Sequence, residues 1–226
     1  MKKGLLKIQW EDIKHYTDEE ITYFLFLEGK DYNAISKIRN ISKETVQKHI
    51  IDGKIKYGFL AKSKNEKELL INISKAGKLD KLDIIKSLDL NMKEKLIQYI
   101  KQNYVDMYGK EKETAIWIIG ELKDTSCNNI LVKASVHKFV NVRRMAVSAM
   151  GKIQDIKFEM SLIRALEDEN SQVVTYSIKA LTKINSQKAY KKIQKIYLDS
   201  QKEYIKKAAG IYLDNINLQL DKEEVR

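Results

Sequence analysis

In the second half of the chain, apolar residues recur at intervals of 31 or 32 residues. A twelve-residue pattern whose last apolar residue is Leu122 returns with the equivalent residue at 153, 184 and 216. Within each copy the apolar positions lie three and four residues apart, as they do on the buried face of an amphipathic helix. The fifth position of every copy is small: Ala115, Ala146, Ser177 and Ala209. The pattern predicts equivalent helices that approach their neighbours closely at these small residues.

A second apolar motif lies between successive copies of the first. Its copies are Ile130-Leu131-Val132, Leu162-Ile163-Ala165-Leu166 and Ile193-Ile196-Tyr197. Each repeat is therefore expected to be two short helices. Because one such pair cannot bury its apolar face alone, the pairs must stack. The sequence predicts an all-α solenoid over residues 111–220.

Two segments of these repeats resemble a known family. Leu166-Glu167-Asp168 followed by Val173, and Val142-Arg143-Arg144 continuing through Ala146 to Gly151, resemble bacterial HEAT repeats of the phycobilisome-lyase-like kind. The resemblance implies HEAT-type helical hairpins and a non-catalytic role in holding a protein partner. The family's arginine after the valine is Arg143 in one copy, whereas the others have Lys112, Val174 and Lys206. A continuous ladder of Asp–Arg pairs between repeats is therefore not expected.

The first sixty residues follow a different rule. Thr17-Asp18-Glu19-Glu20 has the form of a capping box and predicts a helix that ends at Gly29. A short helix over 33–39 should end at Asn40, a residue that tolerates the left-handed conformation. Ser42 should cap a third helix, whose inward residues are Val46, Ile50 and Ile51. A helix, a tight turn and a capped helix form a helix-turn-helix unit, predicted here as a domain over residues 1–60.

This unit also resembles known DNA-binding domains. Ile35-Ser36 with Ile41-Ser42-x-x-Thr45-Val46-x-x-His49-Ile50 resembles the helix-turn-helix of LuxR-type regulators and region 4 of sigma factors. Arg39 stands where those families carry an aliphatic core residue, a role that Ile38 could take by rotation. The resemblance implies binding to double-stranded DNA through the third helix.

The third helix has several positions that its core does not need. In a helix-turn-helix, side chains near the start of this helix face base edges in the major groove. Gln47 could pair with adenine, and Lys43 or Lys48 could reach guanine or phosphate. The predicted DNA-binding residues are Lys43, Glu44, Thr45, Gln47, Lys48 and Lys54. The alternative is that these helices only cap the solenoid or dock a protein.

Residues 61–110 connect the two regions. Helices are expected over 65–73 and 93–108, the second with Leu96, Ile97, Ile100, Tyr104 and Met107 on one face, whereas 78–90 gives no clear pattern. The segment could be a helical connector or a degenerate repeat that caps the solenoid.

Composition strengthens the all-α prediction and indicates the cellular compartment. The chain has no proline and few turn signals, so a strand-rich fold is not expected. The net charge of +11 is spread along the whole chain and is carried mostly by lysine. No apolar stretch reaches the roughly 18–20 residues of a membrane helix, and the basic start lacks the apolar core of a signal peptide. The single cysteine fits a reducing compartment, so a soluble cytoplasmic protein is expected.

Residues that could carry chemistry are sparse. The histidines are isolated along the sequence, and no glycine-rich phosphate loop is present. Cys127 and His137 could in principle form a nucleophile–base pair, but a free cysteine at a turn between helices is the interpretation we favour. Glu167-Asp168-Glu169 is expected to be a solvated loop. We therefore expect no enzyme, no cofactor, no metal and no small-molecule substrate. A remote alternative is a HEAT-like DNA alkylation glycosylase, which would need a carboxylate such as Glu121 beside an aromatic residue such as Trp117. The sequence pattern, however, predicts that Trp117 lies in the core.

The second helix of each pair normally lines the concave side of such a solenoid. Exposed positions expected there, besides Ser148, Thr175 and Asn215, are the predicted partner-binding residues Arg143, Arg144, Lys152, Lys179, Lys183, Lys206 and Lys207.

Together these features predict a HEAT-repeat binding protein with a DNA-binding helix-turn-helix, a transcription-associated regulator or adaptor. The alternative is a pure protein-interaction scaffold.

Overall fold

The computed structural model describes the backbone of residues 1–224 and the side chains of residues 1–218. The chain forms two compact units, Met1–Tyr99 and Ile100–Arg226, called here the N-terminal and C-terminal units. Apart from one two-stranded hairpin, the regular structure of the described residues is helical. The all-α prediction is confirmed.

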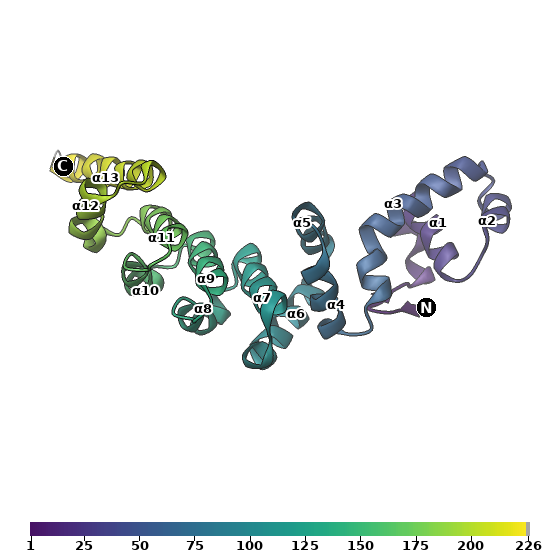
Figure 1. The fold of residues 1–226 in the computed structure, drawn as a ribbon. Coiled ribbons are helices and arrows are strands. Elements are labelled where there is room, and N and C mark those ends of the chain that lie inside the picture. The colour runs from purple at the N-terminus through teal and green to yellow at the C-terminus, as the bar shows by residue number, and fades with distance from the viewer. Residues whose placement is uncertain (225–226) are drawn as a thin grey trace. The chain divides into compact units, whose positions relative to one another are not determined.

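The N-terminal unit begins with a small antiparallel hairpin and continues as helices (Figure 1). Its elements are β1 (Lys2–Lys3), β2 (Leu6–Lys7), the 3₁₀ helix η1 (Trp10–His15), α1 (Asp18–Leu27), α2 (Tyr32–Arg39), α3 (Lys43–Lys62), α4 (Glu66–Lys75) and α5 (Lys78–Ser87). The break between the two units falls within α6 (Leu90–Asn103).

Local signals set the start and end of α1 and the start of α3 as predicted. Thr17 and Glu20 form both hydrogen bonds of the capping box at the start of α1. At its end the N–H of Gly29 donates to the Phe26 carbonyl, and the next N–H donates to the Leu25 carbonyl, which is a Schellman motif. Ser42 accepts from the N–H of Thr45 and caps α3.

The hairpin at the N-terminus was not predicted. Its turn residue Gly4 has a φ of +59°, and a Cβ there would lie 2.6 Å from the carbonyl oxygens of Leu60, Ala61 and Ser63. The N–H of Leu5 donates to the Leu60 carbonyl over 3.0 Å. The hairpin therefore covers the C-terminal end of α3, where helix carbonyls lack partners within the helix.

The segment that the sequence left open is helical throughout most of its length. The predicted helices over 65–73 and 93–108 correspond to α4 and to α6 with the following 3₁₀ turn η2 (Tyr104–Asp106). The expected apolar face of the second one, residues 96, 97, 100, 104 and 107, is buried. The stretch without a clear pattern contains α5. The division into domains at residues 60 and 110 stays a prediction.

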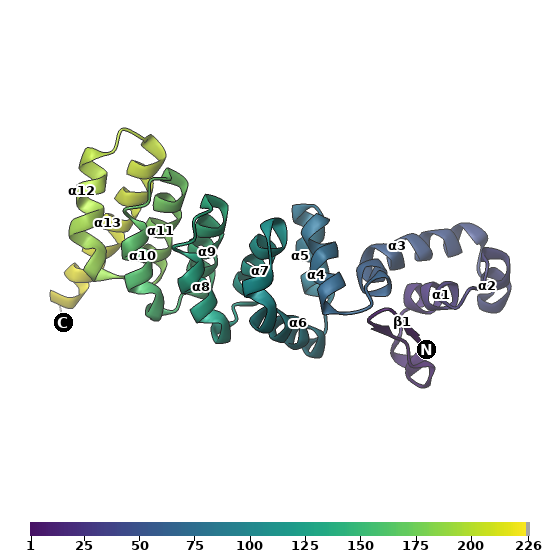
Figure 2. The ribbon, with the colours of Figure 1, turned by 60° about the horizontal axis from the view of Figure 1, so that its bottom comes forward.

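The C-terminal unit is a stack of helical hairpins, in which each of α9, α11 and α13 contacts the long helix before it (Figures 1 and 2). Its helices are α7 (Gly109–Leu122), α8 (Asn128–Ala134), α9 (Val140–Ile153), α10 (Glu159–Ala165), α11 (Ser171–Lys183), α12 (Tyr190–Asp199) and α13 (Glu203–Glu224). Three 3₁₀ turns precede the shorter helices: η3 (Thr125–Cys127), η4 (Ile156–Phe158) and η5 (Gln187–Ala189). The helices α7, α9, α11 and α13 form one layer, and α8, α10 and α12 form the other.

The repeat of the sequence is reproduced in the backbone. The helices α7, α9 and α11 are each followed by a residue in the left-handed conformation, and these are Lys123, Gln154 and Asn185. Each 3₁₀ turn then ends in a buried residue, and each shorter helix buries one equivalent aliphatic side chain. The two sets are Cys127, Phe158 and Ala189, and Leu131, Leu162 and Ile193.

Small residues allow the long helices to touch along their backbones. The four residues at the fifth position of the pattern are fully buried. A Cβ on Gly120 of α7 would lie 2.8 Å from the Cα of Ala149 on α9. A Cβ on Gly151 would lie 3.0 Å from the Cβ of Ala180 on α11. Close packing of neighbouring hairpins thus follows from the small residues of the repeat.

Among residues 1–224, no helix combines the length and the apolar character that a membrane span requires.

Candidate nucleic-acid interface and partner surface

The turn between α2 and α3 has the geometry of a helix-turn-helix. Asn40 adopts the left-handed conformation, with φ 50° and ψ 46°. The Ser36 hydroxyl donates to the Ile41 carbonyl over 2.6 Å, and the Ile41 N–H donates back to the Ser36 carbonyl over 3.2 Å. Ser36 therefore ties the last turn of α2 to the entrance of α3.

Beneath this turn, a polar network replaces an aliphatic contact. Arg39 donates to the carboxylate of Asp18, to the Asp18 carbonyl over 2.9 Å and to Thr22 Oγ1 over 3.1 Å. The buried hydroxyl of Thr22 also lies 3.2 Å from Nδ1 of His49. Ile38 is exposed, so the expectation that it would rotate into the core was wrong. Arg39 fits because α1 supplies oxygen partners for its guanidinium.

A second network joins the start of α1 to the middle of α3. The carboxylate of Glu20 accepts from the Thr17 N–H over 2.9 Å, from Lys56 Nζ over 2.7 Å and from the Tyr57 hydroxyl. Burial alone would raise the pKa of Glu20, but the hydrogen bonds from Lys56, Tyr57 and Thr17 outweigh burial and lower it. Glu20 stays ionised and holds α3 in place.

The N-terminal part of α3 presents a polar face to solvent. Val46 and Ile50 are buried against α1 and α2, whereas four of the predicted DNA-binding residues are exposed: Lys43, Glu44, Gln47 and Lys48. Thr45 is only half exposed, and its hydroxyl lies 3.1 Å from that of Ser42. Thr45 belongs to the cap of the helix more than to its outer face.

Lys54 lies apart from the other predicted contacts. It comes eleven residues after Lys43, so the two are separated by about 16 Å along the helix axis. Its ammonium group lies 5.0 Å from the centre of the Phe26 ring. This separation is too large for Lys54 and Lys43 to reach the same base pair.

The outer face of α3 also carries two apolar residues, one of which the sequence placed inside. Ile51, expected to face inward, is 49% exposed, and Ile55 four residues later is 68% exposed. Both lie opposite the buried positions 46, 50 and 53 on the helix. The inward direction is filled by Tyr23 of α1, whose ring lies where a Cβ on Gly53 would fall, at 2.2 Å.

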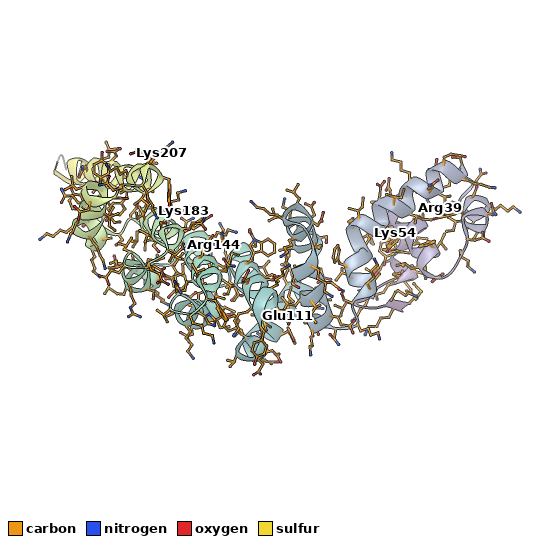
Figure 3. The ribbon with its side chains drawn as sticks, viewed as in Figure 1. Arg39, Lys54, Glu111, Arg144, Lys183 and Lys207 are labelled. Atoms are coloured by element: carbon orange, nitrogen blue, oxygen red, sulfur yellow. The ribbon has the colours of Figure 1, made fainter. Side chains whose placement is uncertain are left out.

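In the C-terminal unit, two adjoining hollows lie along α9, α11 and α13, with volumes of about 570 and 440 Å³. They share Tyr176, Lys179, Ala208 and Ile211. We call this surface the basic groove and define it by Arg144, Tyr176, Lys179, Lys183, Lys207 and Ile211. Figure 3 shows Arg144, Lys183 and Lys207 on the same side of the stack. Five of the predicted partner-binding residues line the hollows: Arg144, Lys152, Lys179, Lys183 and Lys207.

Arg143 is not free for a partner. Its side chain is 11% exposed and its Nε and Nη2 donate to the two carboxylate oxygens of Asp168 over 2.6 and 3.0 Å. It also donates to the His137 carbonyl over 2.9 Å. Burial alone would raise the pKa of Asp168, but the hydrogen bonds from Arg143 and from the Asn170 N–H lower it. This pair joins two adjacent hairpins, so Arg143 has a structural role. Lys206, the other predicted contact outside the hollows, is half buried.

The two glutamates of the 167–169 loop are solvated as expected, with side chains 70% and 87% exposed, and each also forms an ion pair. Glu167 pairs with Lys192 over 2.7 Å, and Glu169 lies 3.2 Å from Arg143. All three carboxylates of the loop are therefore ion-paired, each with a residue of an adjacent hairpin.

Lys152 connects the two residues of the glycosylase alternative. Its ammonium group donates to the carboxylate of Glu121 and lies 6.0 Å from the centre of the Trp117 ring, which is half buried. Glu121 is thereby engaged in the contact between α7 and α9.

Cys127 is buried, and burial is the main cause that raises its pKa to about 11. A thiol with this pKa is protonated at neutral pH, which does not favour a nucleophile.

Sequence reasoning missed part of the basic groove. Tyr176 is 38% exposed and was not among the predicted contacts, whereas Thr175, expected to be exposed, is buried and donates to the Ser171 carbonyl over 2.7 Å. Tyr204 and Ile211 are half exposed. Of the missed residues, Ile211 had an available signal, because it is the seventh position of its copy and lies four residues after Lys207, which places the two on one helix face.

Comparisons with known proteins support the N-terminal assignment. Residues 18–105 match the family model of a helix-turn-helix domain, from α1 into the turn after α6. The chain is similar in structure to the crystal structure of an engineered protein, a target of the Northeast Structural Genomics Consortium. The two are 15% identical, the match covers 89% of this chain and 97% of the other, and the TM-score is 0.50. This likeness concerns the fold alone. No curated protein shows significant sequence similarity to the chain.

Proposed function

We propose that the chain is a non-catalytic, cytoplasmic bacterial binding protein. Its helix-turn-helix binds double-stranded DNA, and its hairpin stack, a short series of HEAT-type repeats, holds a protein partner. The protein acts as a transcription-associated regulator or adaptor.

The observation that carries this proposal is the outer face of α3. A cap at Ser42 and a buried Val46 hold the helix, while Lys43, Gln47 and Lys48 point to solvent where a helix-turn-helix reads the major groove. The match to the helix-turn-helix family model supports the same use. The exposed carboxylate of Glu44 has a lowered pKa, caused first by its own backbone N–H and then by Ser42. Ionised Glu44 repels phosphate but can accept a hydrogen bond from cytosine.

Two features support the assignment of the hairpin stack to the HEAT type. Its backbone repeats with the spacing of the sequence pattern, including the left-handed residue after each of α7, α9 and α11. The pair between Arg143 and Asp168 uses residues that carry the resemblance to that family. Stacked helical repeats of this kind present extended surfaces for binding.

The test is binding of the full chain to a randomised duplex pool, measured by fluorescence anisotropy between about 50 and about 200 mM salt. The logarithm of the affinity should fall linearly with that of the salt concentration, with a slope near −0.9 per phosphate contacted. Lys43→Ala and Lys48→Ala should each flatten the slope by about one unit. Gln47→Ala should instead change which sequences are selected from the pool, because it removes a base contact.

Lys67→Ala is the matched control, because Lys67 is an exposed lysine of α4 in the same unit. It should leave the salt slope unchanged. Absence of duplex binding at the lowest salt, or equal effects of the α3 lysines and Lys67, would contradict DNA binding.

A second candidate function is protein docking through the N-terminal unit. The exposed Ile51 and Ile55, four residues apart on α3, favour it because a helix face used for a protein partner is often apolar. If duplex DNA is not bound, Ile51→Asp with Ile55→Asp should abolish capture of a partner by the full chain, and the α3 lysines should not matter. This outcome would replace the regulator by a pure scaffold.

A further inference from the structure

The basic groove has positive charges that no carboxylate of the described side chains neutralises. Arg144, Lys179, Lys183 and Lys207 have no carboxylate partner among the residues whose side chains are described. None of the described residues that line the two hollows is acidic. Arg143 and Lys152 lie on the same helix as Arg144, but both of them are ion-paired, whereas Arg144 is not. An anionic partner is the natural complement of this surface.

The floor of the groove is apolar. Val147, Ala180, Ala208 and Ile211 line the hollow of about 440 Å³, and Gly151 deepens it because it has no side chain. Ile211 is half exposed at the junction of the two hollows. This floor offers a dry surface to a partner's apolar side chains, which would gain about 25 cal/mol per Å² of apolar surface removed from water.

The rim carries two half-exposed tyrosines. Tyr176 lies between the hollows, with the Lys179 ammonium group 6.0 Å from its ring centre, and Tyr204 lies at the edge of the larger hollow. A tyrosine of this kind contributes a large apolar ring and a polar hydroxyl at low conformational cost, as in many protein interfaces. Cations and aromatic rings therefore surround an apolar floor.

We propose that the basic groove binds an acidic peptide segment of a protein partner, with apolar side chains seated on the Ile211 floor and carboxylates held by Lys179, Lys183, Lys207 and Arg144. This inference rests on the proposed function and names the chemistry of the partner. Single-stranded nucleic acid fits less well, because the aliphatic floor would leave the polar base edges without hydrogen-bond partners.

The test begins with selection of random peptides, displayed on ribosomes, by the immobilised full chain at low salt. The selected peptides should be enriched in Asp and Glu that flank Leu, Ile or Phe. A labelled peptide of the enriched sequence is then titrated in solution. Lys179→Glu with Lys207→Glu should weaken its binding by at least about tenfold, since both attraction and repulsion change. Ile211→Asp should also weaken it by about tenfold, because a charge would enter the apolar floor.

Lys133→Glu is the matched control. Lys133 is an exposed lysine on α8, in the other layer of the stack, and its change alters the net charge as each groove lysine does. It should reduce peptide affinity by less than about twofold. Circular dichroism of each variant establishes that a loss of binding is not a loss of folding.

Three results would overturn the inference. These are a selection without enrichment of acidic residues, peptide binding that the groove variants do not weaken, and an oligothymidine that binds the groove more tightly than the peptide. Duplex DNA binding is measured on the same wild-type sample. A protein that binds the duplex but no peptide contradicts only this inference, and one that binds the peptide but no duplex contradicts only DNA binding.

Discussion

The helix-turn-helix of the N-terminal unit and the hairpin stack of the C-terminal unit are stabilised in different ways. In the former, side chains at helix ends cap each helix, with Thr17, Asp31 and Ser42 each accepting from an N–H three residues later. The Arg39–Asp18 and Glu20–Lys56 pairs, which do not repeat along the chain, then join the capped helices. In the latter, contacts between residues more than twenty positions apart recur from one repeat to the next. The Arg143–Asp168 pair and the Glu159–Lys188 pair are two of them. A DNA-reading helix needs a fixed turn, whereas a stack needs matched neighbours.

The ion pairs within the stack also determine which of its basic residues remain available to partners. On α9, Arg143 and Lys152 are bound to acids of adjacent hairpins, while Arg144 between them has no such partner. On α11, the residue equivalent to Arg143 is Val174, and both Lys179 and Lys183 are unpaired among the described side chains. Ion pairing inside the stack thus occupies Arg143 and Lys152 of α9 but leaves Lys179 and Lys183 of α11 without a carboxylate among the described side chains.

The largest expected effect comes from the core of the stack. Phe158 ends the η4 turn and is fully buried, so Phe158→Ala should lower the free energy of unfolding of the C-terminal unit by about 4 kcal/mol. Urea unfolding followed by tryptophan fluorescence measures this change. The chain has two tryptophans, Trp10 and Trp117, one in each unit. In a Trp10→Phe background the signal therefore reports the C-terminal unit.

The control for Phe158 is Phe139→Ala. Phe139 is 58% exposed, so its loss should cost less than about 1 kcal/mol. In a Trp117→Phe background, Ile50→Ala should produce a comparable loss in the N-terminal unit, about 3 kcal/mol. If Phe158→Ala proved as mild as Phe139→Ala, the repeated turn residue would not be part of the core that unites the hairpins.

A smaller effect is expected from the pair between repeats. Arg143→Met leaves the carboxylate of Asp168, which is 8% exposed, without its main partner. The variant should lose about 2–3 kcal/mol at pH 7. Arg144→Met, the change at the adjacent unpaired arginine, should lose less than about 0.5 kcal/mol. Equal losses in the two variants would mean that the pair contributes no net stability.

The same pair predicts a pH dependence. The pKa of Asp168 in the folded chain is below its usual value of 3.8. Its stabilising contribution is therefore complete above that value and is lost as the pH falls through the lowered folded pKa. The stability difference between the wild type and Asp168→Asn should be largest near pH 7 and should shrink below about pH 4. Urea unfolding of both proteins across this range measures it.

Much of the fold could be predicted because the signals that specify it are local or periodic. The capping box at Thr17, the left-handed Asn40 and the small residues of the repeat are each visible in a short stretch of sequence. The β-hairpin was missed because its position depends on a distant element, the carbonyls at the end of α3. The inward assignment of Ile51 failed because Tyr23 fills the space on that side.

The candidate sites were harder to predict than the fold. Lys43, Gln47 and Lys48 could be assigned to the outer face because helix geometry alone decides which residues oppose Val46 and Ile50. Arg143 was misassigned because its partner Asp168 lies 25 residues away on another hairpin. Tyr176 was not among the predicted contacts because an aromatic ring matches an apolar pattern, although its hydroxyl favours a half-exposed position.

The smallest expected effect uses one substitution in both regions. Gly120→Ala in α7 and Gly58→Ala in α3 both replace a helical glycine, and without steric conflict this change stabilises a helix by about 0.5–1 kcal/mol. At Gly58 no heavy atom lies within 4 Å of the new Cβ, whereas at Gly120 the Cα of Ala149 lies 2.8 Å away. Gly58→Ala should therefore stabilise its unit, and Gly120→Ala should destabilise its unit by about 1–2 kcal/mol.

The change in the free energy of unfolding is measured for each glycine variant in the single-tryptophan background of its own unit. Opposite signs of the two changes are the decisive observation. Gly151→Ala should fall between them, because its nearest contacts, the Cβ and Cα of Ala180, are farther away at 3.0 and 3.3 Å. A stabilising Gly120→Ala would mean that α7 and α9 separate at little cost. Direct backbone contact would then not be what holds the repeats together, and the contrast between local caps in one unit and matched neighbours in the other would fail.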